Sequence, residues 1–203
     1  MSLRDRFIDV TARKPSGWIG RSLYRESRPH RQGFDRLKTE LALRPGETVV
    51  ETGCGAGVLL QEMLAVCAAG AAIDHSPEMI ALSAERNHAA IAAGRLDLRL
   101  GDVHALPWAD ASFDAAASAH MFFFVADPGR MLAEVRRVLK PGGRLVIVTA
   151  ARSASLFLRP YAPAMRYYSD ADLSGLVTAA GFVAVRVWTE GRHLQLAHAT
   201  APL

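Results

Sequence analysis

The hydrophobic pattern of the chain switches repeatedly between two periods. Short runs of small and β-branched apolar residues indicate buried strands, and the segments after them repeat their apolar positions every three or four residues, as helices do. The pattern predicts strands at 48–52, 71–74, 96–102, 113–120, 144–150, 182–188 and 193–199. It predicts helices at 56–66, 76–93, 127–140 and 169–181.

Strands and helices that alternate through short connections indicate a parallel sheet covered on both faces. Right-handed crossovers make such a sheet doubly wound. Only a short turn at Glu190 and Gly191 separates the last two strands, so these two must run antiparallel to each other. We therefore expect an α/β, Rossmann-like fold: a doubly wound, seven-stranded, mostly parallel sheet whose last strand is antiparallel.

The first 43 residues follow a different pattern and are expected to form a helical arm or lid. Leu3, Phe7 and Val10 share one helical face, and Phe34, Leu37 and Leu41 share another. Prolines at 15 and 29 interrupt the helix between them. The turn sequence RPGE at 44–47 then separates the arm, 1–43, from the main domain, 44–203.

Composition narrows the class of protein. Half of the 203 residues are hydrophobic and 22% are charged, which indicates a globular chain. Cys54 and Cys67 form no metal-binding pattern, and no apolar run is long enough to span a bilayer. The N-terminus lacks the apolar core of a signal peptide, so we expect a cytoplasmic protein. Residues 1–31 carry a net charge of +5 within an overall charge of +4, which places the basicity in the arm.

The segment VVETGCGAGVLL at 49–60 holds the most informative motif. Gly53, Gly55 and Gly57 follow the first strand, at the edge where doubly wound sheets bind ligands. The spacing does not fit G-x-G-x-x-G, because the third glycine position is Val58 or Leu60. A Gly-Lys-Ser/Thr phosphate loop is also absent, and the next helix opens without Lys or Arg. These features favour a ligand without phosphates.

The spacing E-x-G-x-G-x-G at 51–57 resembles motif I of the class I S-adenosylmethionine-dependent methyltransferases. AIDHSPEMIALSAERN, LRLGDVHALPWADASFDAAAS and LAEVRRVLKPGGRLVIV resemble later segments of the same family in the same order. The resemblance covers roughly residues 44–190. It is closest to the small-molecule methyltransferases of the ubiquinone-biosynthesis type.

This resemblance implies S-adenosylmethionine as the cofactor and gives roles to the acids. Glu51 would order the glycine loop and the methionine end of the cofactor, Asp74 would hold the ribose hydroxyls, and Asp102 would accept from the adenine amino group. The backbone of Val103 would lie along the adenine edge, and His75 either stacks on adenine or is simply exposed. The remaining expected cofactor-binding residues are Gly53, Cys54, Gly55, Gly57, Met79 and Ser118.

The resemblance does not identify the acceptor. A methyltransferase needs no dedicated base for every acceptor, because alignment alone contributes much of the rate. If a base acts, His120 is the candidate, since histidine titrates near neutral pH; packing beside the cofactor is the alternative. We expect methyl transfer to an oxygen, nitrogen or carbon atom of a small, partly apolar acceptor. The arm and residues 153–168 are expected to shape the site that binds this acceptor.

Two other functions stay open. The arginines at 21, 25 and 28 share a helical face, so a contact with anionic lipid would suit a methyltransferase acting on a lipid or quinone at a membrane surface. A catalytically silent protein that binds the cofactor is the other alternative. Nucleic acid is not expected as a partner, because no nucleic-acid-binding motif is present.

Overall fold

The computed structural model describes residues 30–151 and 165–203. Seven strands form one sheet in the order β3-β2-β1-β4-β5-β7-β6. Their bounds are β1 Thr48–Thr52, β2 Ala69–Asp74, β3 Leu96–Leu100, β4 Phe113–Ala119, β5 Leu139–Ala150, β6 Val183–Glu190 and β7 Leu194–Thr200. Strand β7 runs antiparallel to both of its neighbours, and the pairs from β3 to β5 are parallel. The expected doubly wound sheet is confirmed.

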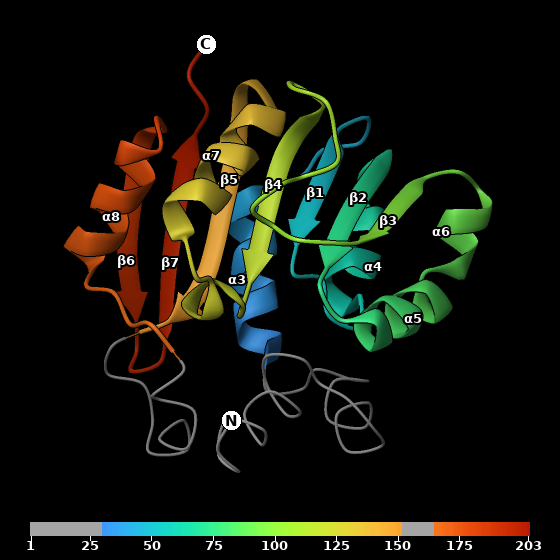
Figure 1. Ribbon diagram of the computed structural model, residues 1–203, viewed down its shortest axis with the longest axis horizontal. Coiled ribbons are helices and arrows are strands. Elements are labelled where there is room, and N and C mark those ends of the chain that lie inside the picture. Colours follow the sequence, from blue (N-terminus) through green and yellow to red (C-terminus); the bar gives the residue numbers. More distant parts are fainter. Residues whose placement is uncertain (1–29, 152–164) are drawn as a thin grey trace.

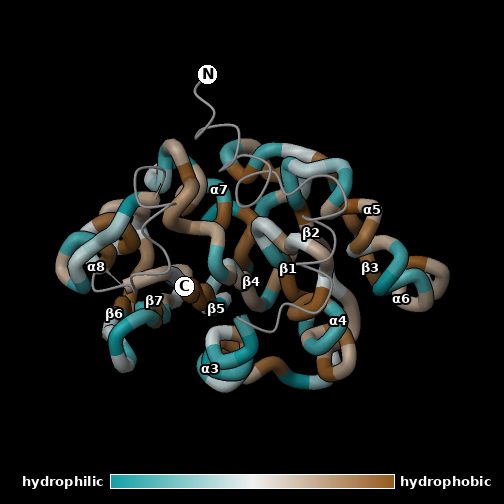
Figure 2. The backbone as a smooth tube through the Cα atoms, turned by 90° about the horizontal axis from the view of Figure 1, so that it is seen from below, coloured by the Kyte–Doolittle hydropathy of each residue, from teal (hydrophilic) through white to brown (hydrophobic). Residues whose placement is uncertain are grey.

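Helices cover both faces of the sheet (Figures 1 and 2). One face carries α3 Arg31–Leu41, α4 Val58–Leu64, α5 Pro77–Arg86 and α6 His88–Ala92. The other carries α7 Pro128–Val138 and α8 Asp170–Ala179, and a short 3-10 helix, η3 Phe122–Phe124, follows β4. The carboxyl ends of the parallel strands all lie at the lower edge of the sheet in Figure 1.

No helix lies between β3 and β4. The side chains of Leu106 and Trp108, on the connection between these strands, pack into the core beside α7 instead. Arg137 of α7 holds this connection by donating hydrogen bonds to the carbonyl oxygens of Leu106 at 2.9 Å and Trp108 at 2.8 Å. One guanidinium group therefore satisfies backbone acceptors that a helix would otherwise have satisfied.

Strand β4 occupies the centre of the sheet although alanine is a poor strand former. Its small side chains at 115 and 117 lie on the face that α3 covers, together with Leu37 and Leu41, which are fully buried. Small residues on the strand let the helix approach closely. Residues 31–41, which are part of the expected arm, thus form a helix packed against the sheet. Residues 1–29, which include the basic face, lie outside the described residues.

The two largest differences from the predicted element boundaries concern one helix and one strand. The single helix expected at 76–93 is divided into α5 and α6 at Asn87. The Asn87 side chain turns inward and donates to the carbonyl oxygens of Gly57 and Ser83, so a tertiary contact breaks the helix. Strand β5 begins at Leu139 rather than 144, because Leu139 already pairs with Phe113 before a register shift at the Pro-Gly-Gly turn.

Helix α3 can be tested as a core element with Leu37→Ala. Removing a fully buried leucine side chain should lower the free energy of unfolding by about 2–5 kcal/mol, measured by urea denaturation. The exposed Gln32 on the same helix is the matched control, and Gln32→Ala should change stability by no more than about 0.5 kcal/mol. Equal effects of the two substitutions would show that α3 is not part of the folded core.

Candidate functional site

A cavity of about 690 Å³ opens at the carboxyl ends of β1, β2, β3 and β4. The sheet order reverses between β1 and β4, which is the point where doubly wound sheets bind their ligands. Ten of the residues expected from the sequence line this cavity: Glu51, Gly53, Cys54, Gly55, Asp74, His75, Met79, Asp102, Val103 and His120. Gly57 and Ser118 are not among the lining residues.

The glycine loop is tied to the end of β2. The backbone N–H groups of Gly53 and Cys54 donate to the Ile73 carbonyl at 2.8 and 3.2 Å. The N–H of Gly55 donates to the Asp74 carboxylate at 2.9 Å. These bonds bend the chain after β1 so that the loop backbone borders the cavity.

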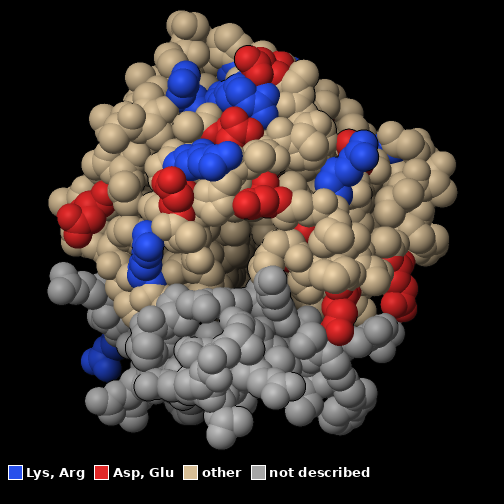
Figure 3. Space-filling view, in the orientation of Figure 1, with Lys and Arg blue, Asp and Glu red and all other residues tan. Residues whose placement is uncertain are grey.

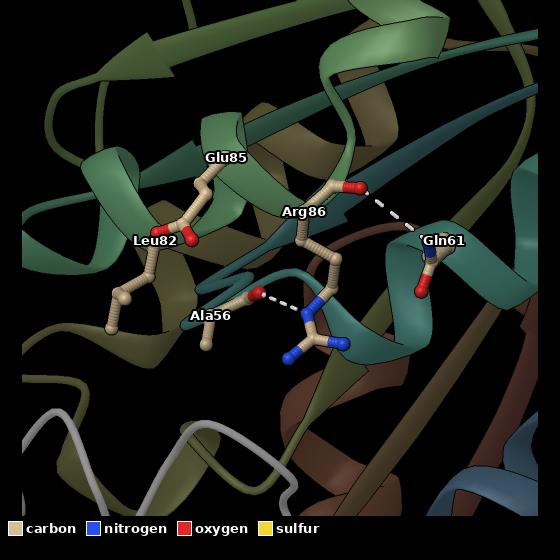
Figure 4. A pocket seen from close by; sticks show the side chains of 5 residues that line it. All are labelled: Ala56, Gln61, Leu82, Glu85 and Arg86. Atoms are coloured by element: carbon tan, nitrogen blue, oxygen red, sulfur yellow. Dashed lines mark hydrogen bonds between the residues drawn. The ribbon is translucent and has the colours of Figure 1, made fainter.

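Helix α5 holds the other side of the same loop. Arg86 donates from Nε to the Ala56 carbonyl at 3.0 Å, beside a second pocket of about 320 Å³ between α4 and α5 (Figure 4). Asn87 Nδ2 donates to the Gly57 carbonyl at 3.1 Å. Gly57 therefore packs against α5 on the side of the loop that faces away from the cavity. It is the N-cap of α4 with φ 72°, and a Cβ at this position would lie 2.3 Å from Ser83 Oγ.

Asp74 links the loop to the start of α5. Its Oδ1 accepts from the Ser76 N–H at 2.9 Å, while Oδ2 accepts from Gly55. Ser76 in turn caps α5, with Pro77 at the first helical position, as the sequence predicted. Asp74 lines the cavity, and each of its oxygens can accept a second hydrogen bond, because a carboxylate oxygen can accept two. The neighbouring His75 is half exposed, with Nδ1 3.6 Å from Asp74 Oδ1.

Glu51 lies at the end of β1 between Ala72 of β2 and Ala117 of β4. The residue is 2% exposed, and its buried Oε2 has no hydrogen-bond partner. Burial, and then the nearby charge of Asp74, raise the pKa of Glu51 well above its usual range. A cationic ligand would offset both effects, because it supplies the missing partner and the opposite charge.

Asp102 lies past the end of β3, on the outer wall of the cavity. Its side chain is 69% exposed, and Oδ1 accepts from the backbone N–H of His104 at 2.9 Å. This backbone bond is the largest of the effects that lower the pKa of Asp102, so the carboxylate is ionised at neutral pH. The described lining of the cavity thus contains three acids, Glu51, Asp74 and Asp102, and neither Lys nor Arg.

Histidine and aromatic side chains form the wall nearest α3. The His120 ring stacks on His30 at a centroid distance of 4.4 Å, and Phe34 lies 5.9 Å from it. His120 Nε2 is buried without a hydrogen-bond partner beside Gly33, where a Cβ would lie only 2.2 Å away. Burial, with a smaller contribution from His30, lowers the pKa of His120 to about 3, so its imidazole is neutral at neutral pH.

Ser118 takes a structural position, whereas Cys54 lines the cavity with a buried thiol. Ser118 is fully buried in β4, where it pairs with Thr52 and Ile147 in the sheet, and it does not reach the cavity. The Cys54 thiol is buried, and burial raises its pKa well above the ordinary value, which makes it a poor nucleophile.

Twelve further residues line the cavity without having been named as cofactor-binding or catalytic candidates, although the apolar run 121–125 was expected to pack the core or line the substrate pocket. They are His30, Phe34, Ala56, Val58, Leu100, Gly101, His104, Ala119, Met121, Phe124, Val125 and Ala126. Most of them belong to no sequence motif. Apolar residues that line a cavity follow the same sequence pattern as apolar residues that fill a core, so the sequence does not distinguish the two. The sequence also did not indicate that Arg86 and Asn87 support the glycine loop. Their hydrogen-bond partners are backbone carbonyls 30 residues away, and such contacts have no local sequence signal.

The fold and this cavity define a class of protein: an α/β Rossmann-like domain with a ligand site at its glycine loop. Comparison with known proteins supports this class. Residues 50–147 match the family model described as a methyltransferase domain. The crystal structure of an S-adenosylmethionine-dependent methyltransferase from Aquifex aeolicus superimposes with a TM-score of 0.69 at 20% identity, over 99% of this chain and 100% of that one, which supports the fold.

Sequence relatives point to the same family. An uncharacterized 37.1 kDa protein in transposon TN4556 of Streptomyces fradiae is 43% identical over 110 residues, or 53% of this chain and 31% of that protein. A ubiquinone biosynthesis O-methyltransferase of Xanthomonas oryzae pv. oryzae is 32% identical over 130 residues, or 64% of this chain and 52% of that protein. The chain therefore spans about half or less of the length of these curated relatives.

Residues 50–147 thus resemble a methyltransferase domain, and together with the relatives and the fold this match supports a class I S-adenosylmethionine-dependent methyltransferase. S-adenosylmethionine is the cofactor of this class, and the residues present fit it. The buried, unpartnered oxygen of Glu51 and the acids around the cavity suit a ligand that carries a sulfonium and an ammonium group.

The tight packing behind the glycine loop can be tested with Gly57→Ala. Gly46, with φ 93° and no atom within 4 Å of an added Cβ, provides the matched control. Gly46→Ala should cost only the strain of a left-handed backbone, about 1–2 kcal/mol. Gly57→Ala should cost a further 1–3 kcal/mol, roughly, from the clash with Ser83 and Asn87. Equal costs by urea denaturation would contradict the contact.

The neutral state of His120 predicts a pH-dependent stability. Between about pH 3 and 6.5 the unfolded chain binds a proton on this histidine and the folded chain does not, so stability falls as the pH is lowered through 6.5. Asn tolerates the left-handed backbone of this position, φ 57°. His120→Asn should therefore remove up to about 1.4 kcal/mol per pH unit from the slope of the unfolding free energy. An unchanged slope would argue against the buried, neutral imidazole.

Proposed function

We propose that this chain transfers the methyl group of S-adenosylmethionine to an oxygen, nitrogen or carbon atom of a small, partly apolar acceptor. One observation supports this above the others. Three acids, Glu51, Asp74 and Asp102, stand at or just past the ends of three adjacent strands and face one cavity beside the glycine loop.

Each acid has a role that its surroundings support. Glu51 is buried and unpartnered, which suits the cationic methionine end of the cofactor. Asp74 is held by two backbone N–H groups and keeps acceptor capacity for the ribose hydroxyls. Asp102 is ionised and exposed to the cavity, which suits the adenine amino group. Met79 and His75 line the cavity beside Asp74, and the Val103 backbone follows Asp102 along the expected adenine edge.

When bound, S-adenosylmethionine supplies a methyl group already activated by the sulfonium. What remains for the protein is to exclude water and to hold the acceptor in line with that group, which can supply most of the rate. His120 remains our candidate for a contact with the acceptor. Because its imidazole is neutral, it can accept a hydrogen bond from an acceptor hydroxyl, but a pKa of about 3 makes it a weak base.

The acceptor side of the cavity supports a small, partly apolar molecule. Phe34, Met121 and Phe124 line it with the two stacked histidines. The total volume of about 690 Å³ lies within the range of small-molecule sites. An oxygen atom is the favoured target because relatives are named O-methyltransferases, among them a ubiquinone biosynthesis enzyme.

Action at a membrane surface has no support from a specific contact. None of the helices formed by residues 30–151 and 165–203 is long and apolar enough to cross a bilayer. On the face of the described residues seen in Figure 3, acidic and basic side chains are interspersed. The arginines that suggested an anionic partner lie at positions 21, 25 and 28, outside the described residues.

Binding of S-adenosylhomocysteine tests the proposal without an acceptor. Calorimetric titration should show saturable binding, and Asp74→Asn should weaken it about tenfold or more, since hydrogen bonds to charged groups contribute about 1.5–3 kcal/mol. Asp35, exposed on α3 away from the cavity, is the matched control, and Asp35→Asn should bind as the wild type does. No binding at millimolar ligand would refute the proposal.

A second measurement separates an enzyme from a silent cofactor-binding protein. The wild type is incubated with labelled S-adenosylmethionine and a panel of phenols, catechols, aliphatic alcohols and amines. Transfer of label to a phenol or catechol is the expected result. Tight binding of the cofactor with no transfer to any member of the panel would favour the silent alternative.

A further inference from the structure

Asp102 is held by a residue that no motif identified. His104 Nδ1 lies 2.6 Å from Asp102 Oδ1, and the backbone N–H of His104 donates to the same oxygen at 2.9 Å. The His104 side chain is only 18% exposed, whereas that of Asp102 is 69% exposed. A half-buried imidazole therefore fixes an otherwise exposed carboxylate.

A second contact defines which nitrogen of His104 carries the proton. The backbone N–H of Asp127 points to His104 Nε2 at 3.3 Å. A backbone N–H can only donate, so Nε2 must be the acceptor and the proton of the neutral ring must reside on Nδ1. Nδ1–H then donates to Asp102, and the two hydrogen bonds support the same tautomer.

His104 is itself anchored on the start of α7. Arg130 donates from Nε to the His104 carbonyl at 3.0 Å. Asp127, whose backbone contacts the imidazole, caps α7 by accepting from the Arg130 N–H at 3.0 Å. Asp102 is thus connected through one imidazole to a rigid helix terminus, and its rotamer is set by that connection.

The arrangement leaves one carboxylate oxygen available. Both donors from His104 reach Oδ1, and among the described residues no hydrogen bond is made to Oδ2. Asp102 and His104 both line the cavity. A carboxylate held in this way can present Oδ2 in one direction, where it would accept from an amino group and repel a carbonyl oxygen.

We propose that His104 is a positioning residue that orients Asp102 and thereby gives the site its preference for a 6-aminopurine over a 6-oxopurine. This inference rests on the proposed function, because it assumes that an adenosine-bearing ligand occupies the cavity. It assigns to His104 a role in selectivity that acts through Asp102.

The test compares two ligands that differ at the amino position: S-adenosylhomocysteine and its 6-oxo analogue, S-inosylhomocysteine. Calorimetry should give the wild type a Kd for the 6-oxo analogue at least about tenfold higher. His104→Ala should weaken the amino ligand by about fivefold to tenfold and leave the 6-oxo ligand nearly unchanged, so that the discrimination shrinks.

Three further variants control for structure. His104→Phe keeps a ring without a donor and should lose the discrimination as His104→Ala does. His104→Asn should retain it, because the amide nitrogen occupies the same place along the side chain as Nδ1 and can donate to Asp102. His88, which is exposed at the start of α6 with Nδ1 3.1 Å from the Glu85 carbonyl oxygen and does not line the cavity, is the matched control, and His88→Ala should resemble the wild type.

The outcomes separate this inference from the proposed function. If the wild type binds neither ligand, both fail. If it binds S-adenosylhomocysteine but His104→Ala and His104→Phe keep the full discrimination, only the positioning role of His104 is overturned. An equal loss of affinity for both ligands would also overturn it, because that result describes a structural residue rather than a selective one.

Discussion

The structure of the site depends on one hydrogen bond, between the Gly55 N–H and the Asp74 carboxylate. It joins the loop after β1 to the end of β2, and it exists because these strands are parallel neighbours whose carboxyl ends meet at one edge. The loop can curve under the cavity only because this bond and the two bonds to Ile73 replace the sheet partners it gives up. The same contact fixes the position of Asp74, so the loop and this cavity-lining acid are placed together.

The buried acid of the site lowers the stability of the folded protein. A buried carboxyl group without a partner is unfavourable, and Glu51 is such a group. Its neighbours in the sheet are alanines on both sides, so no residue of the described core compensates it. Exceptions of this kind concentrate at functional sites, where the ligand completes what the fold leaves unsatisfied. A sulfonium cofactor, as proposed above, would supply the opposite charge that this acid lacks.

The wall near α3 shows a different constraint, one of space. Gly33 leaves room for the His120 ring between α3 and β4, and His120 has a left-handed backbone as β4 ends. The ring is consequently buried and stacked on His30, and this burial, rather than a charged neighbour, makes it a weak base. The same packing that joins α3 to the sheet therefore limits the chemistry available to the candidate base.

Much of this protein could be predicted from its sequence, and the limits have a physical cause. Hydrophobic period, turn residues and caps are local properties, so the strand and helix order, the doubly wound sheet and the Ser76 cap all followed from them. The expectation for Glu51, Asp74 and Asp102 came instead from the resemblance of their motifs to a known family, and all three line one cavity. Contacts between distant segments have no local signal. The break at Asn87, the support of the loop by Arg86 and the displacement of Ser118 from the cavity depend on which surfaces meet in three dimensions. Tertiary structure likewise decided that His120 is neutral and that His104 holds Asp102, because burial and partner geometry exist only once the chain is folded.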